Sequence, residues 1–480
     1  MIPAEGREPK DLTPVEYDVP SDNLSGQDDY GISPDGKEIA YSMNTDKDQA
    51  LSTNSDIYLQ TIADGKTVKI TNALGADNTL RYSPDGRFIA YRSQAIFGNE
   101  AAKRDLMLYD RTTKKTINLT EQMDNWVGDI FWSLDGKVLY FTILEKGNIP
   151  LLSADVQNQQ IKRVLEGHFT IADGSVSANG RYIAYLKSDI ANPNEVFLLA
   201  IGTKKELQVT NVNKELKESV YFSPAEEHWV PSADGIKIHT FIVKPPNFEK
   251  EKQYGMLFTI HGGPQGMYSN SFRTDYQVFS GAGYVLVFSN PRGSTGYGQK
   301  FTDEINQDWA GKCYDDLMRV IDYALSLGYV DKKRICAYGS SFGGYMVDWF
   351  EGHTDRFACL VSHAGPYNLE SMYATTEELW FAEWDLGGPF WKNPKMYETM
   401  SPHKFVQNFK TPMLITHGEI DYRVPITESM QLFTALQRNN VPSKFLWFPN
   451  EGHGIRKLQN REYWYKTLLE WFHTWMGVVP

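Results

Sequence analysis

The stretch that decides the fold of the second half of the chain is Tyr338-Gly339-Ser340-Ser341-Phe342-Gly343-Gly344. It has the pattern Gly-x-Ser-x-Gly with Ser341 at its centre, and it follows an apolar run of strand length at 334–338. The residues after it, 345–350, continue as a helical pattern. A sharp turn between a strand and a helix pushes one side chain out of the sheet, and flanking glycines let the two elements approach closely. The stretch therefore predicts a nucleophile elbow that exposes Ser341.

A nucleophilic serine needs a histidine base and a carboxylate, and after an elbow of this kind the chain order is serine, acid, histidine. The apolar strand pattern at 413–417 is followed by a loop that contains Asp421. The next strand pattern, 444–448, is followed by a loop that contains His453. Both partners are expected in loops at the carboxyl ends of strands. We therefore expect Ser341, Asp421 and His453 to form a catalytic triad.

The other histidines fit this order less well. His363 ends a strand pattern ahead of any acid-bearing loop, and His417 precedes Asp421 by too few residues. Two more histidines follow no strand pattern, namely His353 and His403. We expect all four to be structural. Glu419 is the alternative acid, because Glu also serves in this role.

An acyl-transfer site also needs two backbone N–H donors that face the developing negative charge. One is expected from Phe342, the residue after the nucleophile. The sequence His261-Gly262-Gly263-Pro264 ends an early buried strand pattern, and its glycines allow the backbone to approach a substrate. We expect Gly263 to supply the second donor of the oxyanion hole.

Strand and helix patterns alternate through the second half of the chain. The strand patterns are apolar runs at 237–243, 256–261, 284–289, 334–338, 357–362, 413–417 and 444–448. The helical patterns are amphipathic and lie at 315–327, 342–352, 427–439 and 460–476. This alternation is typical of a mainly parallel, doubly wound sheet with helices on both faces. Together with the elbow, it predicts an α/β hydrolase domain over residues 226–480.

The first 225 residues contain a repeat. A turn of the form Ser-x-Asp-Gly or Ser-x-Asn-Gly, each followed by a strand pattern, begins at Ser33, Ser83, Ser133 and Ser177. A degenerate fifth copy begins at Tyr221, and further strand patterns such as 56–59 and 105–109 lie between the copies. Repeats with the spacing of Ser33, Ser83, Ser133 and Ser177 and with several strands each are typical of propeller blades. Four matched copies argue against a β-sandwich. We expect an all-β, WD40-like or TolB-like partial propeller of about four to five blades over residues 1–225.

Composition limits the partners and the compartment. The chain has 480 residues and a net charge of −12, which argues against nucleic acid or an anionic membrane as a partner. No apolar run approaches the roughly 18 residues that span a bilayer, and residues 1–7 lack a signal-peptide core. We therefore expect a cytoplasmic protein from the sequence as written, or a periplasmic or secreted one if the N-terminus is incomplete.

The three cysteines, Cys313, Cys336 and Cys359, form no disulfide framework, and a serine nucleophile makes cysteine chemistry unnecessary. We expect them to act as small buried hydrophobic residues. We also expect no cofactor and no metal, and the sequence leaves a homo-oligomer open.

Taken together, these motifs resemble the prolyl oligopeptidase family of serine peptidases. The matching stretches, in chain order, are 261–264, 290–298, 339–345, 417–425 and 451–454. Residues 377–389 are similar to the acylaminoacyl-peptidase and dipeptidyl-peptidase-V branch of that family. The resemblance implies a serine peptidase that hydrolyses short peptides, as a dipeptidyl or acylaminoacyl exopeptidase, with a propeller that restricts access to the site.

The resemblance also suggests which residues bind the substrate. By their positions after the matching motifs, Phe342, Leu369, Met372 and Val424 would form the S1 pocket. Members of the family carry seven or eight blades, so this chain departs from the family's pattern with fewer than five.

An exopeptidase that recognises a free amino terminus needs a carboxylate to pair with the buried amine. Glu377, Glu378 and Glu383 lie in an aromatic-rich segment after the 357–362 strand pattern, so we expect at least one of them to bind the amine. Ordinary surface charges would give the same pattern. Two other functions stay open at this point, an esterase or lipase of the same fold and a non-catalytic propeller interaction protein. The propeller argues against the first and the complete triad against the second.

Overall fold

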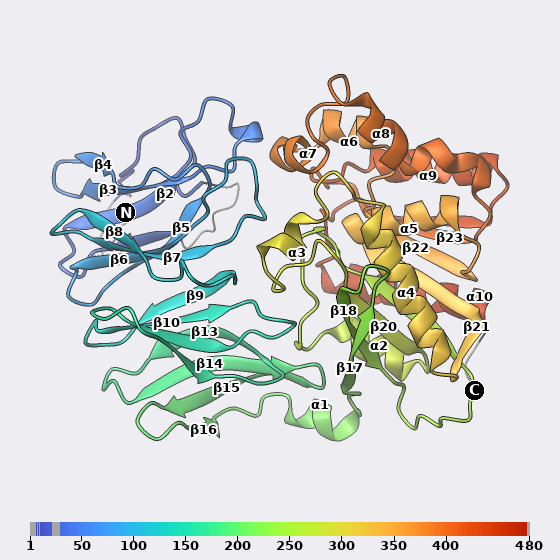
Figure 1. Ribbon diagram of the computed structural model, residues 1–480, viewed down its shortest axis with the longest axis horizontal. Helices are drawn as coiled ribbons and strands as arrows, with labels where there is room; N and C mark the ends of the chain where they lie inside the picture. The colour runs from blue at the N-terminus through green and yellow to red at the C-terminus, as the bar shows by residue number, and fades with distance from the viewer. Residues whose placement is uncertain (1–5, 7, 9, 22–28, 478–480) are drawn as a thin grey trace. The chain divides into compact units, whose positions relative to one another are not determined.

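The computed structural model describes residues 6, 8, 10–21 and 29–477. The chain forms two compact units, which are coloured by residue number in Figure 1. The first unit comprises residues 1–187 and 195–211, and the second comprises residues 188–194 and 212–480.

The first unit is built from four antiparallel sheets of four strands, in which each strand pairs with the next one along the chain. Their strands are β1 (Tyr30–Ile32), β2 (Glu38–Met43), β3 (Asp56–Thr61), β4 (Thr67–Lys69), β5 (Asp77–Tyr82), β6 (Phe88–Ser93), β7 (Asp105–Asp110), β8 (Lys115–Asn118), β9 (Val127–Trp132), β10 (Val138–Ile143), β11 (Leu151–Asp155), β12 (Ile161–Leu165), β13 (Thr170–Val176), β14 (Tyr182–Asp189), β15 (Asn192–Ala200) and β16 (Lys205–Gln208). The first strand of each sheet contacts the first strand of the next, so the four sheets follow one another as blades in chain order. A short 3₁₀ helix, η1 (Gln49–Leu51), precedes β3.

The repeated turn joins the first two strands of every blade and is closed by the same hydrogen bonds each time. In the second blade, Ser83 Oγ donates to Asp85 Oδ1 at 2.6 Å and accepts from the N–H of Phe88 at 2.8 Å. The turn glycine, Gly86, has a φ of +70°, which a residue without Cβ adopts at little cost. The equivalent serine–carboxylate or serine–amide bonds recur at Ser33, Ser133 and Ser177. The sequence repeat is therefore a repeat of one turn geometry.

The fifth copy of the repeat is not a blade. The segment that begins at Tyr221 leads directly into β17 (Ala225–Pro231), which pairs with β18 (Lys237–Val243) at the edge of the second unit's sheet. Its serine, Ser223, donates its N–H to the side chain of Gln277 in that unit at 2.8 Å. Only the Ser-Pro dipeptide is kept here, and without the Asp-Gly pair the turn cannot close.

The second unit contains one eight-stranded sheet in the order β17-β18-β20-β19-β21-β22-β23-β24. β18 runs antiparallel to both of its neighbours, and the strands from β20 to β24 are parallel. The remaining strands are β19 (Tyr254–Ile260), β20 (Val285–Asn290), β21 (Val330–Ser340), β22 (Cys359–His363), β23 (Met413–Gly418) and β24 (Ser443–Phe448). This mainly parallel sheet confirms the α/β hydrolase fold expected from the alternating patterns.

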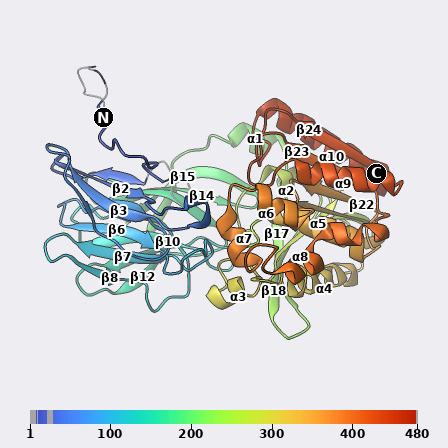
Figure 2. The same cartoon turned by 90° about the horizontal axis from the view of Figure 1, so that it is seen from above.

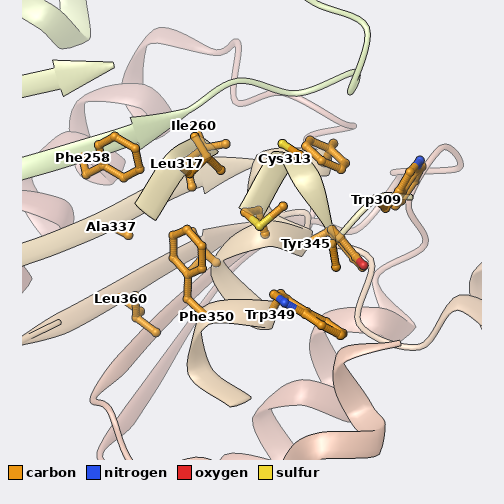
Figure 3. Close-up of a cluster of buried hydrophobic side chains, with 14 of the residues drawn as sticks. Phe258, Ile260, Trp309, Cys313, Leu317, Ala337, Tyr345, Trp349, Phe350 and Leu360 are labelled. Atoms are coloured by element: carbon orange, nitrogen blue, oxygen red, sulfur yellow. The ribbon is translucent and has the colours of Figure 1, made fainter. Parts of the chain in front are cut away.

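Helices cover both faces of this sheet (Figures 1 and 2). They are α1 (Lys214–Ser219), α2 (Thr274–Gly281), α3 (Gln299–Asp303), α4 (Lys312–Ser326), α5 (Phe342–His353), α6 (Leu369–Thr375), α7 (Leu379–Asp385), α8 (Pro394–Met400), η2 (Pro402–Asn408), α9 (Thr427–Arg438) and α10 (Leu458–Met476). Alternate strand residues point to opposite faces. Phe258 and Ile260 of β19 therefore belong to the hydrophobic cluster that also contains side chains of α4, α5 and α9, as Figure 3 shows for α4 and α5, while Leu257 belongs to a second cluster with side chains of α2 and α10.

All three cysteines are buried and free, as expected for small hydrophobic residues. Across the described residues, no helix is both long enough and apolar enough to cross a membrane.

Candidate active site

Ser341 occupies the turn between β21 and α5 in a backbone conformation that serine rarely adopts, with a φ of 59° and a ψ of −123°. The three glycines around it are required by close packing. A Cβ on Gly339 would lie 2.1 Å from the carbonyl oxygen of Gly343, and one on Gly343 would lie 2.2 Å from that of Ile260. A Cβ on Gly344 would lie 2.7 Å from the Cα of Gly365. The elbow is therefore held in a strained form by its neighbours, as is common at functional sites.

Asp421 and His453 lie in the loops after β23 and β24 and contact each other. His453 Nδ1 lies 2.7 Å from Asp421 Oδ2. Asp421 is buried, while the imidazole of His453 remains about one-third exposed, with 30% of its side chain accessible. If Nδ1 carries the proton that this contact requires, Nε2 is left free to accept one.

The carboxylate of Asp421 is stabilised as an anion. Burial works against its charge, but hydrogen bonds from His417 and His453 outweigh burial and hold its pKa well below the ordinary value. The other oxygen, Oδ1, accepts the backbone N–H groups of Arg423 and Val424, each at 3.0 Å. The acid is therefore charged and fixed in orientation, which is what an imidazole partner needs.

His417 is a site residue that sequence reasoning took for a purely structural one. Its Nε2 lies 3.2 Å from Asp421 Oδ2 and 2.8 Å from the carbonyl oxygen of Val424, so Nε2 carries the proton. Its Nδ1 lies 2.7 Å from Ser429 Oγ, which donates to it. His417 thus supplies the acid with a second imidazole donor. Its position four residues before Asp421 argues against a role as base, but the same spacing allows it to donate to the carboxylate.

The other candidates for the base and the acid are neutral, exposed or in other parts of the domain. Burial lowers the pKa of His363 to about 3, and its Nδ1 lies 2.8 Å from Thr416 Oγ1. His353 Nδ1 donates to Trp349 O at the far end of α5, and His403 lies in η2. Glu419, the alternative acid, is exposed, whereas Asp421 is buried against His453.

The glycine loop expected to supply the second oxyanion donor lies against Ser341. A Cβ on Gly262 would lie 3.1 Å from Ser341 Cβ and 3.7 Å from Ser341 Oγ, so the backbone of this loop approaches the serine side chain. Gly263, the next residue, has a φ of +121°. Phe342, the other expected donor, is the first residue of α5.

The loop at 290–298 supports this glycine loop. Ser294 Oγ lies 3.0 Å from His261 Nε2, and the N–H of Thr295 donates to the carbonyl of Gly266 at 2.9 Å. Burial lowers the pKa of His261 to about 4, which keeps the ring neutral. The supporting loop is itself fixed by Arg292.

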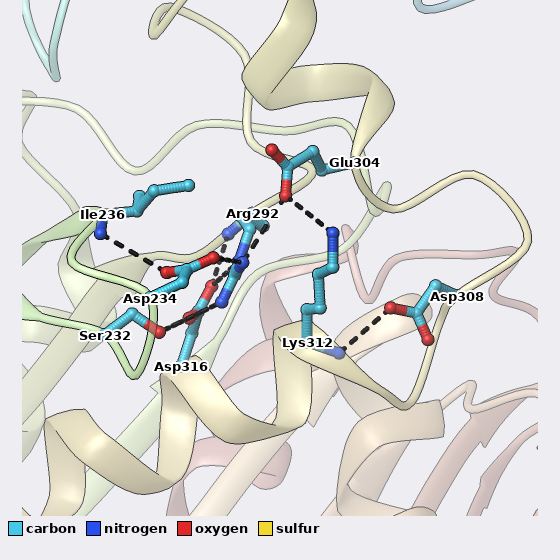
Figure 4. A network of polar contacts seen from close by, with 8 residues as sticks. All are labelled: Ser232, Asp234, Ile236, Arg292, Glu304, Asp308, Lys312 and Asp316. Atoms are coloured by element: carbon cyan, nitrogen blue, oxygen red, sulfur yellow. Dashed lines mark hydrogen bonds and ion pairs between the residues drawn. The ribbon is translucent and has the colours of Figure 1, made fainter.

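Arg292 is buried and lies at the centre of the polar network in Figure 4. It bonds Asp316 of α4 through Nε at 2.9 Å and Nη2 at 2.7 Å, and it bonds Ser232 and Asp234 of the β17–β18 turn at 3.0 and 2.5 Å. The bonds to Asp316 raise the pKa of Arg292 above its ordinary value. A bidentate pair of this kind fixes orientation as well as charge. The loop that holds the oxyanion side of the site is thus tied to the sheet edge and to α4.

The residues suggested for an S1 pocket are all buried within one hydrophobic cluster. Phe342, Leu369, Met372 and Val424 each expose 2% or less of their surface. Trp309 belongs to the same cluster and packs edge-on against Phe342, with ring centroids 5.2 Å apart.

The three glutamates expected near the substrate amine differ in their surroundings. Glu378 is buried and lies 2.5 Å from Arg423 Nη2, and exposed Glu377 lies 3.6 Å from the same nitrogen. Glu383 lies on α7 and accepts a hydrogen bond from Tyr373 Oη at 2.5 Å.

Comparison with known proteins agrees with this arrangement. Residues 270–479 match the prolyl oligopeptidase family, and residues 30–230 match the TolB beta propeller domain. The chain is 36% identical over 471 residues to dipeptidyl-peptidase 5 of Porphyromonas gingivalis, covering 96% of this chain and 68% of that protein. It is 31% identical to dipeptidyl-peptidase 5 of Schizosaccharomyces pombe, covering 94% of this chain and 66% of the yeast protein.

Among solved structures, the acylaminoacyl peptidase of Pyrococcus horikoshii has the same fold, with a TM-score of 0.82 and 24% identity over 93% of this chain and 70% of that one. An elbow serine and an Asp–His pair, each at the end of a parallel strand of an α/β hydrolase sheet and preceded in the chain by propeller blades, define a serine peptidase of a particular architecture. The chain belongs to the prolyl oligopeptidase family of serine peptidases.

Proposed function

We propose that this protein is a serine exopeptidase that removes dipeptides from free amino termini, with Ser341 as nucleophile, His453 as base and Asp421 as acid. The proposal is carried by the 2.7 Å contact between His453 Nδ1 and Asp421 Oδ2, together with the elbow that holds Ser341 at a φ of 59°. The similarity to dipeptidyl-peptidase 5 over nearly the whole chain supports the choice of a dipeptidyl product.

The proposed chemistry is acyl transfer in two steps. His453 Nε2 takes the proton of Ser341 Oγ as this oxygen attacks the scissile carbonyl, and the backbone N–H groups of Phe342 and Gly263 bind the oxyanion that forms. His453 then gives the proton to the leaving amine, and the carbon–nitrogen bond breaks to leave an acyl-enzyme. A water molecule, deprotonated by His453, releases the dipeptide by the reverse sequence. Asp421 holds the imidazole and stabilises its charged form.

The side chain before the scissile bond is proposed to bind among Phe342, Leu369, Met372 and Val424. This assignment follows from the family resemblance, and a pocket lined by these apolar side chains would prefer an apolar residue, because each buried methylene contributes about 0.8 kcal/mol.

The substrate amine is proposed to pair with at least one of Glu377, Glu378 and Glu383. Glu378 already faces the guanidinium of Arg423, so its charge is compensated. Within the part of the chain that the structure describes, Glu383 takes part in no ion pair, and its Oε1 accepts from the neutral hydroxyl of Tyr373. An uncompensated carboxylate attracts a cation more strongly than a paired one. Glu383 is therefore the favoured anchor.

The test compares a dipeptidyl amide with its amino-acetylated form in the wild type and in Glu377→Gln, Glu378→Gln and Glu383→Gln. Loss of the anchor should reduce kcat/KM for the free-amine substrate by about 1.5–3 kcal/mol, or roughly 10- to 150-fold, and spare the acetylated one. Glu398→Gln is the matched control, because Glu398 is an exposed glutamate on α8 and is not one of the three candidates. A wild type that prefers the acetylated substrate would instead identify an acylaminoacyl peptidase.

A further inference from the structure

One buried carboxylate joins two elements that border the proposed oxyanion hole. Asp385, the last residue of α7, exposes 2% of its surface. Both of its carboxylate oxygens lie 3.0 Å from Gln265 Nε2, and Oδ2 also accepts from Trp309 Nε1 at 3.2 Å. Its backbone carbonyl accepts the N–H of Gln307 at 2.9 Å. Segments 265, 307–309 and 385 are therefore held together at this one residue.

The first of these contacts reaches the glycine loop. Gln265 follows Gly263 by two residues, and the same loop is held on its other side by Thr295, whose N–H donates to Gly266 O. Gly263 has no side chain of its own to fix its orientation. The amide of Gln265, anchored at Asp385, is the nearest hydrogen-bonding side chain downstream of Gly263.

The second contact, between Asp385 and Trp309, leads to Phe342, the other proposed oxyanion donor. The indole of Trp309 is buried and packs edge-on against Phe342 at 5.2 Å and against Tyr345 at 5.1 Å. Its N–H donor points to Asp385, so rotation of the ring would break that hydrogen bond. The position of Trp309 in turn limits where Phe342, and thus the first turn of α5, can lie.

We propose that Asp385 is a positioning residue that sets the geometry of the oxyanion hole by fixing both of its sides, through Gln265 on one and Trp309 on the other. This inference rests on the proposed function. A carboxylate suits this task better than an amide, because it offers two acceptor oxygens and no donor, and therefore receives both N–H groups in one orientation. Burial of a carboxylate is costly unless it is well bonded. The presence of Asp385 at this place therefore suggests that Gln265 and Trp309 must be held in fixed orientations.

The experiment measures ground-state and transition-state recognition separately in Asp385→Asn. A peptide aldehyde forms a hemiacetal with the nucleophile and places its oxygen in the oxyanion hole, whereas a product dipeptide does not. We expect kcat to fall by about 10- to 100-fold with KM changed less than about threefold. The inhibition constant of the aldehyde should rise by a similar factor, and that of the dipeptide should stay unchanged.

Milder variants separate positioning from a general loss of folding. Trp309→Phe and Gln265→Met each remove one donor to Asp385, and each should reproduce part of the effect on the aldehyde. Gln265→Met combined with Asp385→Asn should be little worse than Asp385→Asn alone, because both changes break one contact. Glu351→Gln is the matched control, since Glu351 is a carboxylate with 1% exposure that also accepts from two N–H groups, those of Lys410 and Thr411. It should leave the aldehyde constant unchanged.

Two outcomes overturn the inference. The first is an inhibition constant for the aldehyde that stays unchanged in Asp385→Asn, Trp309→Phe and Gln265→Met. The second is an equal loss of aldehyde and dipeptide binding, which a general structural role would give. Ser341→Ala, measured in parallel, distinguishes the two proposals. If Ser341→Ala still turns over substrate, the proposed function fails, whereas an inactive Ser341→Ala with a fully active Asp385→Asn rejects only the positioning role.

Discussion

The blade turns and the nucleophile elbow are both tight turns at positive φ, but they give that conformation to different residues. In the four blades, the residue is glycine each time, with φ between 67° and 70° at Gly36, Gly86, Gly136 and Gly180. In the elbow, the residue is Ser341 at 59°, although glycines surround it. A scaffold turn uses the residue for which the conformation is cheap, whereas a site accepts strain to place a reactive group. The residue type at positive φ thus distinguishes the two regions.

The two regions also differ in how far apart along the chain their bonded residues lie. The serine side-chain bonds that close each blade turn join residues at most five positions apart, such as Ser83 and Phe88. The contact between Asp421 and His453 spans 32 positions, and that between Gln265 and Asp385 spans 120. A blade can therefore tolerate a defect in its own turn, while the site depends on the whole sheet.

Replacement of Ser341 should give the largest effect and test the elbow side of the comparison. Ser341→Ala should reduce kcat by a factor on the order of 10⁶, as removal of a triad nucleophile does, with a melting temperature close to that of the wild type. The measurement is steady-state kinetics on a dipeptidyl amide together with thermal unfolding.

Ser341→Gly sharpens the same comparison. This variant should be as inactive as Ser341→Ala, but its free energy of unfolding should be higher than that of Ser341→Ala by about 1–2 kcal/mol, because glycine relieves the strained backbone. A glycine variant that is less stable than Ser341→Ala would show that the elbow stores no strain at this residue.

Asp421→Asn comes next in expected size. The amide keeps the shape of the acid but stabilises the wrong tautomer of His453, so kcat should fall by a factor on the order of 10⁴. Glu419→Gln, two positions away and exposed, is the control and should change kcat little. A severe defect in Glu419→Gln with a mild one in Asp421→Asn would reverse the assignment of the acid.

Two carboxyl groups, Asp135 in a blade turn and Glu351 on α5, should respond to pH in opposite directions. The turn carboxylate Asp135 has its pKa lowered by the hydroxyl of Ser133, so its contribution to stability is lost only as the pH falls. Burial raises the pKa of Glu351 on α5 to about 7. The folded protein then keeps a proton that the unfolded chain has released, and this stability is full below about pH 4 and lost as the pH rises through 7.

The expected size of the Glu351 effect is on the order of 2 kcal/mol between pH 5 and pH 8. Urea unfolding at the two pH values measures it. Glu351→Gln should reduce the loss, since the amide oxygen still accepts the N–H groups of Lys410 and Thr411 and does not titrate. If the variant loses as much unfolding free energy between pH 5 and pH 8 as the wild type does, another buried carboxyl must titrate. Glu428, whose pKa burial raises to about 7, is one such group.

Gly86→Ala should give the smallest effect. A Cβ at this position would meet only ordinary contacts, the nearest 3.5 Å away, so the cost comes from the φ of +70° alone and should be about 1 kcal/mol of unfolding free energy. The kcat of this variant should equal that of the wild type. A large loss of activity would mean that the blade turn influences the site after all.

Local patterns in the sequence were sufficient for much of the fold. The strand at 237–243 and the helix that starts at Phe342 were predicted at the residues where β18 and α5 lie, because their apolar patterns are long and regular. α6, α7 and α8 were missed, since seven residues are too few to show a helical period. β17 was hidden in the degenerate fifth repeat, and only pairing with β18 reveals it.

In the site, too, local sequence patterns reveal some residues, while only the folded structure reveals the others. Asp421 and His453 could be found because each occupies a defined loop after a recognisable strand. The second imidazole on Asp421, from His417, and the contacts of Asp385 could not, because they join residues through the folded sheet and leave no periodic trace in the sequence. Residue type and spacing therefore suffice to propose the reacting groups, while the groups that orient them require coordinates.

The most direct test of the central claim, that Ser341 is a nucleophile activated by His453, is labelling with a fluorophosphonate followed by mass spectrometry of the peptides. The wild type should carry one adduct, on Ser341, and His453→Ala should react more slowly by a factor on the order of 10³ or more. An adduct on a different residue, or equal labelling rates in the wild type and His453→Ala, would contradict the account.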